Sequence, residues 1–97
     1  GDIVSAPTYV NTIADGIAVK KPSPEMFKNY IHPYVDQIVS VSDNEIAEAI
    51  VNLMEKDKLI AEGSGAAGVA AVIANKFKLK PNAVVLVCGG NIDLNTM

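Results

Sequence analysis

Two glycine-rich segments, each at the border of an apolar stretch, place the strongest constraint on the fold of this 97-residue chain. The first is EGSGAAGVAA at residues 62–71, and the second is CGGNID at residues 88–93. Glycine-rich turns at the ends of strands are where α/β proteins commonly bind their ligands. The pattern therefore favours an α/β fold with a ligand site built on these two turns.

Composition indicates one globular unit, residues 1–97, with no internal domain boundary. Apolar residues make up 49% of the chain, and no apolar run approaches the roughly 20 residues that span a bilayer. A formal charge of -3 and few aromatic side chains argue against a nucleic-acid partner. A single cysteine and a single histidine cannot form an internal disulfide or a structural zinc site, which fits a cytoplasmic protein without a metal. The chain begins with Gly1 rather than Met, which suggests a piece of a longer polypeptide.

The first half of the chain predicts short elements interrupted by proline. Residues 1–10 are expected to form a loop or an edge strand, and residues 12–19 a short helix. A second helix is predicted over residues 24–34, because a proline suits its first turn and apolar side chains repeat at helical spacing; Pro33 should end it. Residues 37–41 are rich in β-branched side chains and predict a buried strand.

The second half predicts two longer helices and another strand. Ser42 and Glu45 form a capping-box pattern before an apolar stripe, which predicts a helix over residues 43–56. Residues 64–77 predict a helix whose many small side chains allow very close packing. A turn at Pro81 and Asn82 precedes the continuous apolar run 83–87, which is typical of a central parallel strand covered on both faces.

The order strand, helix, helix, strand indicates an α/β layer with a parallel sheet flanked by helices. Two strands cannot complete such a sheet, because the apolar faces of the helices need more surface than this segment supplies. We therefore expect the missing strands to come from the rest of a longer polypeptide or from another copy of the chain.

Gly63, Gly65 and Gly68 fit the pattern G-x-G-x-x-G at the start of the second long helix. In dinucleotide-binding proteins this pattern lets a pyrophosphate approach the helix N-terminus. Here the pattern does not follow a clear strand, and the next strand closes on Cys88 rather than on the acidic residue that holds a ribose. The alternative without a ligand is that Ser64 caps the helix and the small residues permit close packing.

Four further residues carry possible chemistry. Cys88 ends a predicted strand, where ligands bind in open α/β folds, although a lone cysteine is more often a small core residue. Glu62 precedes a helix, so its carboxylate either interacts with the helix dipole or lies beside a cofactor or substrate. Asp15 is interpreted as a turn former, and His32 receives no role.

Four segments together resemble the pyridoxal-phosphate-dependent threonine and serine dehydratases. They follow one another in the order and spacing of that family: TIADGIAVK at 12–20, VSDNEIAEAI at 41–50, EGSGAAGVAA at 62–71 and VCGGNID at 87–93. The resemblance covers nearly the whole chain and places it in the later part of the catalytic domain. It implies the fold-type II architecture, in which a twisted parallel sheet lies between two layers of helices; the sheet is incomplete in this chain.

The resemblance also implies roles for individual residues. Cys88 matches a serine or cysteine that faces the pyridine nitrogen of pyridoxal phosphate, and Gly89 and Gly90 shape the turn beside the ring. Glu62 is implied to lie close to the cofactor. Asn91 matches a position that contacts nucleotide in some related racemases, but we do not assign that contact here.

No catalytic residue is expected within residues 1–97. In the resembled family the Schiff-base lysine and the glycine-rich loop that binds the cofactor phosphate lie well upstream of the matched region. Lys20 and Lys21 follow ADGIAV and are not the catalytic lysine. The chain by itself is therefore expected to be inactive.

The implied activity of the parent enzyme is the deamination of L-threonine to 2-oxobutanoate and ammonia by β-elimination. Such an enzyme serves isoleucine biosynthesis or threonine catabolism, and a cytoplasmic homo-oligomer acting on a hydroxyamino acid is expected. Cys88 leaves a serine dehydratase or a racemase open, because cysteine is familiar at that position in serine dehydratases. A non-catalytic nucleotide-binding module and an interaction module are the remaining alternatives.

Overall fold

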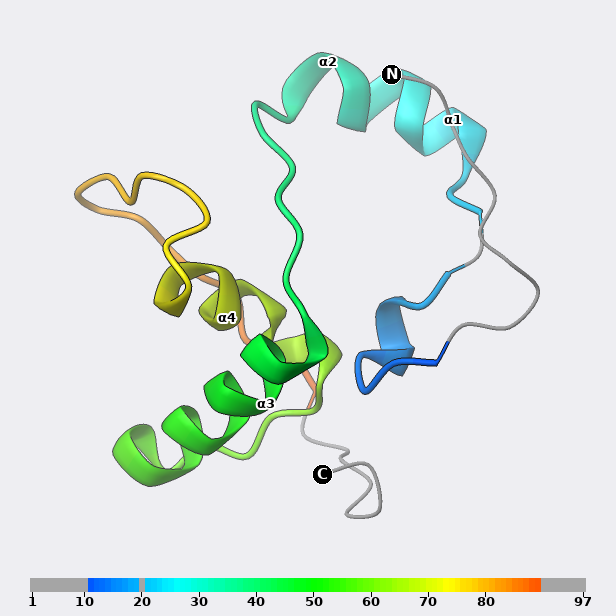
Figure 1. Cartoon of the computed structure of the whole chain (residues 1–97). Helices are drawn as coiled ribbons and strands as arrows, with labels where there is room; N and C mark the ends of the chain where they lie inside the picture. Colours follow the sequence, from blue (N-terminus) through cyan, green and yellow to red (C-terminus); the bar gives the residue numbers. More distant parts are fainter. Residues whose placement is uncertain (1–10, 20, 90–97) are drawn as a thin grey trace.

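The structure, a computed structural model, describes residues 11–19 and 21–89 (Figure 1). It is a flattened body with principal extents of 39 × 37 × 19 Å. Two helices, α3 (Asp43–Asn52) and α4 (Ala67–Ile73), pack against each other at the centre. A separate helix lies at the end of an extended segment and contacts neither of them (Figure 1).

The separate helix runs without a break through α1 (Pro24–Met26), the π-helical turn η2 (Phe27–Ile31) and α2 (His32–Tyr34). The Ser23 hydroxyl caps it by accepting a hydrogen bond from the Met26 N–H at 3.3 Å. The predicted helix 24–34 is thus confirmed in both bounds. Pro33 lies inside the last turn, one residue before the end, and the wider π-helical turn that precedes it is the kind of irregularity that accommodates a missing N–H.

The predicted helix 12–19 is wrong except for one 3-10 turn, η1 (Asp15–Ile17). The reason is a competing set of hydrogen bonds to the Asp43 carboxylate. The Thr12 hydroxyl donates to one oxygen of that carboxylate, and the Ile13 N–H donates to the other at 3.3 Å. This attachment ties the segment to the start of α3 and prevents an earlier helical turn.

The helix predicted over residues 43–56 is confirmed. The capping box forms in both directions: the Glu45 N–H donates to the Ser42 hydroxyl at 3.1 Å, and the Ser42 N–H donates to the Glu45 carboxylate at 2.8 Å. The helix continues beyond α3 through a π-helical turn, η3 (Leu53–Asp57). Lys58 ends it in the left-handed conformation, with φ of 57°.

The second long helix begins at Ser64, as predicted. Its first turn is the 3-10 turn η4 (Ser64–Ala66), and α4 ends at Ile73 rather than at residue 77. Asn75 adopts a φ of 54° and terminates the helical path. The expectation that Ser64 caps this helix is wrong: Gly63 occupies the cap position, and no side chain supplies a capping hydrogen bond there.

Alanine dominates the core between α3 and α4, which explains how closely the two helices pack. The buried cluster consists of Ala14, Ile46, Ala49, Ile50, Leu53, Ala61, Ala66 and Ala70. Small side chains let helix backbones approach, and the larger aliphatic residues of α3 fill the remaining space. The buried small residues at the start of the second helix were expected from the sequence.

The two predicted strands, 37–41 and 83–87, are extended but pair with no other segment among the residues that the structure describes. They are also not buried: Val84 is 86% exposed, Leu86 is 76% exposed and Ile38 is 78% exposed. The expected burial is therefore wrong for this chain, because a strand is covered only when neighbouring strands and helices lie against it. The turn at Pro81 and Asn82 that precedes the second segment is confirmed. Residues 1–10, for which a loop or edge strand was expected, lie outside the described residues.

Candidate functional site

The two glycine-rich turns meet in space. The Glu62 N–H donates a hydrogen bond to the carbonyl oxygen of Gly89 at 3.0 Å, which ties the first turn to the second. Gly89 has a φ of +78°, a conformation that glycine adopts without strain and that other residues rarely adopt. Gly89, the residue after Cys88, thus lies directly against Glu62.

Close backbone packing accounts for the glycines of the first turn. A Cβ atom at Gly65 would overlap the carbonyl oxygen of Cys88, and one at Gly63 would overlap the carbonyl oxygen of Ile13. A Cβ atom at Gly68 would lie 2.9 Å from a methyl group of Val85. The faces that a pyrophosphate would need are occupied by this chain's own backbone, which favours the packing interpretation over the dinucleotide one.

A third segment, residues 13–16, completes the site. Gly16 lies against the Ser64 side chain and the Glu62 carboxylate, because a Cβ atom there would be 2.8 Å from Ser64 Oγ and 3.4 Å from Glu62 Oε1. A Cβ atom at Gly89 would be 2.5 Å from the same oxygen, Glu62 Oε1. The half-buried Glu62 carboxylate is therefore enclosed between two glycines.

The remaining candidate residues, Cys88, Asp15 and His32, differ in exposure and in their distance from the turn cluster. The Cys88 thiol is exposed, so it is not the small core residue that was weighed as an alternative. Gly90 lies outside the described residues. Asp15 forms part of the exposed 3-10 turn η1, as the turn interpretation expected. The His32 ring lies 5.7 Å from that of Phe27 on the separate helix, away from the turns.

Sequence reasoning overlooked two residues of this cluster, Gly16 and Ser64, as site residues. Gly16 lay within the segment predicted as a short helix, and Ser64 was considered only as a helix cap. The available signal was the third glycine-containing turn, ADG, but nothing in the sequence alone indicates that it lies against residues 62–64.

A cavity of about 590 Å³ lies beside the turn cluster rather than in it. Its walls are largely apolar and come from η1, the extended segment before α3, α3 itself and α4; they include Val39, Ile46 and Ala71 but none of Glu62, Cys88 and Gly89. The Thr12 and Asp43 side chains in its wall are hydrogen-bonded to each other. We therefore interpret the cavity as a packing surface and place the candidate site at the turns.

No group of three or more His, Cys, Asp or Glu side chains within the described ranges could hold a metal ion. Among the same residues, no helix has the length and hydropathy needed to cross a membrane.

Comparison with known proteins identifies the chain's relatives. A protein family described as "Pyridoxal-phosphate dependent enzyme" matches residues 1–89. The chain belongs to this family. Its members depend on pyridoxal phosphate, which agrees with the cofactor that the sequence resemblance implied.

Two relatives are L-threonine ammonia-lyases. That of Thermotoga maritima is 52% identical over 85 residues, which cover 87% of this chain and 21% of that protein. That of Geobacter sulfurreducens is 46% identical over 98 aligned residues, covering 100% of this chain and 24% of that protein. A third relative, "L-threonine dehydratase catabolic TdcB" of Staphylococcus aureus, is 42% identical over 87% of this chain and 25% of its own length.

A solved structure has the same fold. The crystal structure of a threonine deaminase from the organism abbreviated T.th. superimposes with a TM-score of 0.88 at 30% sequence identity, over 97% of this chain and 31% of that one. The chain spans about a quarter of the length of the curated relatives above, which it covers to 21%, 24% and 25%. The family resemblance drawn from the four sequence segments is confirmed.

Proposed function

We propose that this chain forms the later part of the catalytic domain of a threonine ammonia-lyase, which deaminates L-threonine to 2-oxobutanoate and ammonia by β-elimination. The observation that carries the proposal is the hydrogen bond of the Glu62 N–H to the Gly89 carbonyl oxygen, which brings Glu62 and Cys88 together at one turn cluster. The identities of 52% and 46% to L-threonine ammonia-lyases support the choice of substrate.

The residues present fit pyridoxal phosphate. The thiol of Cys88 is exposed, and the neighbouring Gly89 has its Cα against the half-buried carboxylate of Glu62. When bound, the cofactor supplies an electron sink that allows the α-proton and the β-hydroxyl of the substrate to leave.

In this proposal Cys88 binds the pyridine nitrogen of the cofactor, while Gly89 and Gly90 shape the turn beside the ring. A thiol is a weak hydrogen-bonding group, and unlike a carboxylate it does not hold the pyridine nitrogen in its protonated form. With such a partner the cofactor ring withdraws electrons less strongly, which suits the loss of a β-hydroxyl. Glu62 lies alongside the cofactor and orients it.

Substitution of Cys88 tests this assignment in the full-length protein that carries the sequence. We expect Cys88→Ser to retain most of the rate of 2-oxobutanoate formation, because a hydroxyl is equally uncharged. We expect Cys88→Asp to lower kcat by about 100-fold or more, the size of effect that follows from altering a charge-determining group in an active site. Full activity of Cys88→Asp together with loss in Cys88→Ser would contradict the role.

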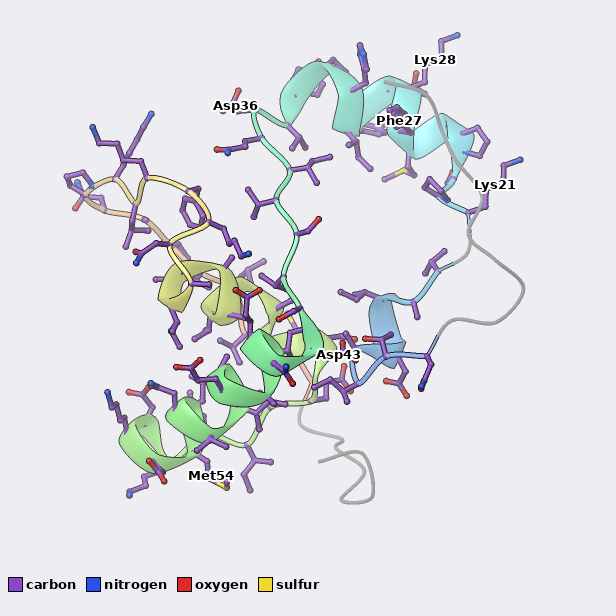
Figure 2. All side chains as sticks on the ribbon, viewed as in Figure 1. Lys21, Phe27, Lys28, Asp36, Asp43 and Met54 are labelled. Carbon is purple, nitrogen blue, oxygen red and sulfur yellow. The ribbon has the colours of Figure 1, made fainter. Side chains whose placement is uncertain are left out.

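We also propose that residues 1–97 alone do not turn over threonine. Lys28 lies on the separate helix and Lys21 just before it, and Figure 2 shows both away from Asp43 at the start of α3. The Schiff-base lysine and the phosphate-binding loop are proposed to come from the preceding part of the enzyme. Formation of 2-oxobutanoate by the purified 97-residue chain with added pyridoxal phosphate would refute this proposal.

A serine dehydratase is the second candidate, favoured by one observation: residue 88 is cysteine, which is familiar at this position in serine dehydratases. The ratio of kcat/KM for L-threonine and L-serine in the full-length protein distinguishes the two, and chiral analysis of the remaining serine detects a racemase.

We further propose a cytoplasmic homo-oligomer that serves isoleucine biosynthesis or threonine catabolism. Light scattering of the full-length protein measures its oligomeric state.

A further inference from the structure

The hydroxyl of Ser64 is buried and has no hydrogen-bond partner among the residues that the structure describes. Buried hydroxyl groups in folded proteins nearly always have a partner, because leaving one unpaired forfeits its hydration without compensation. Ser64 also does not cap the helix that it begins. The hydroxyl is therefore free to hydrogen-bond with a polar group beside it.

The carboxylate of Glu62 is an acceptor that lies against the same glycine as the Ser64 hydroxyl. Within the described chain, no side-chain hydrogen bond or ion pair involves its oxygens. Ser64 Oγ and Glu62 Oε1 both lie against Gly16, at 2.8 Å and 3.4 Å from the position that a Cβ atom of that residue would occupy. An unpaired donor and an unpaired acceptor are thus confined by the same glycine.

We propose that Ser64 is a positioning residue for Glu62. After rotation about χ1, its hydroxyl donates a hydrogen bond to the Glu62 carboxylate. This bond holds the carboxylate in one orientation beside the cofactor, and Gly16 keeps the space between them free of a side chain. The inference rests on the proposed function, since it gives Glu62 its place beside pyridoxal phosphate.

A double-mutant cycle on the full-length protein tests the pairing. The Kd for pyridoxal phosphate is measured by absorbance titration for the wild type, Ser64→Ala, Glu62→Ala and the double variant. We expect Ser64→Ala to raise Kd about 10-fold to 100-fold, which corresponds to the loss of one hydrogen bond to a charged group. In the Glu62→Ala background the same substitution is expected to change Kd by less than about twofold, because its partner is gone.

Two further variants serve as controls. Ser64→Thr retains the hydroxyl and should restore a Kd close to that of the wild type. Ser23→Ala removes a serine hydroxyl from the separate helix, which contacts no other element, and should leave Kd unchanged. The proposal is overturned if Ser64→Ala has no effect in the wild-type background, or if its full effect persists in the Glu62→Ala background.

Failure of the proposed function is distinguishable from failure of the pairing. If the wild-type protein does not bind pyridoxal phosphate, the proposed function fails, and the same four variants are compared by their urea unfolding midpoints. A shift caused by Ser64→Ala that vanishes in the Glu62→Ala background then still supports the pairing, whereas equal shifts in both backgrounds overturn it.

Discussion

The carbonyl oxygen of Cys88 lies so close to the Cα atom of Gly65 that residue 65 cannot carry a side chain. This requirement comes from backbone approach and not from an unusual conformation. The contact joins the two turns of the candidate site, so a change at residue 65 affects the position of Cys88 directly. At the scale of single residues, the lack of a side chain at Gly65 therefore determines where Cys88 lies.

We expect Gly65→Ala to destabilise the protein by about 3 kcal/mol or more, at or beyond the upper end of ordinary overpacking, because the obstructing atom belongs to the backbone. Gly68→Ala is the matched control. Its Cβ atom would meet a side-chain methyl of Val85 at 2.9 Å, which can move aside, so a loss of about 1 kcal/mol is expected. Urea unfolding of both variants measures the difference, and equal losses would contradict the backbone contact.

At the scale of elements, the start of α3 is held by the capping box and by an ion pair to the residues after α4. The amino group of Lys76 lies 3.3 Å from the Glu45 carboxylate. The backbone N–H of Ser42 is the main cause of a lowered pKa of Glu45; partial burial opposes it, and the hydrogen bond and charge of Lys76 add to it. Glu45 thus links the two central helices through one carboxylate.

This lowered pKa predicts an acid-dependent stability. Because the pKa of Glu45 is lower in the folded than in the unfolded protein, its contribution is complete above the unfolded value of about 4.3 and disappears as the pH falls through the folded pKa. We expect Glu45→Gln, which keeps the capping geometry but does not titrate, to lose less stability than the wild type on acidification from about pH 6 to pH 3.

The measurement for this prediction is the urea midpoint as a function of pH. Ser42→Ala is the comparison, because it removes the hydroxyl half of the capping box and should cost about 0.5–2 kcal/mol at every pH in that range. Parallel pH profiles for the wild type and Glu45→Gln would show that Glu45 does not carry the acid dependence.

At the scale of the whole molecule, the two extended segments leave large apolar side chains uncovered. Val84 and Leu86 are 86% and 76% exposed, and the threonine deaminase with the same fold contains about three times as much chain, since this one covers 31% of it. Exposed apolar segments of extended backbone favour association with other chains. In the proposed enzyme, further strands of the catalytic domain cover these side chains.

We therefore expect the 97-residue chain, expressed alone, to self-associate. The double substitution Val84→Lys and Leu86→Lys should shift it toward monomer in light scattering, because charge opposes edge pairing. In the full-length protein the same substitutions should abolish soluble expression, because they place charges in a covered strand. Leu79→Lys, in the loop before the extended segment, is the control and should do neither. A monodisperse monomer of the unmodified chain would contradict the prediction.

Local sequence signals predicted the helices to different degrees. The helix 24–34 and the capping box of Ser42 and Glu45 were predictable because their hydrogen bonds join residues close in sequence. The helix 12–19 was not, because Asp43, far along the chain, binds the backbone and side chain of its first residues. The end of α4 was missed because Asn75 adopts a left-handed conformation that the neighbouring sequence does not predict.

For the site, the sequence by itself determined the residue types and the family: the segments containing Gly16, Glu62 and Cys88 resemble threonine and serine dehydratases in their order, and the matched family confirms it. The tertiary structure alone decided that these three segments meet, that the G-x-G-x-x-G glycines serve close packing, and that the Ser64 hydroxyl is buried against the same glycine as Glu62. The physical reason is that contacts between distant segments depend on shape and on competing hydrogen bonds, which a linear pattern does not contain. Strand burial depends in the same way on neighbouring strands, and within the described ranges none pairs with residues 37–41 or 83–87.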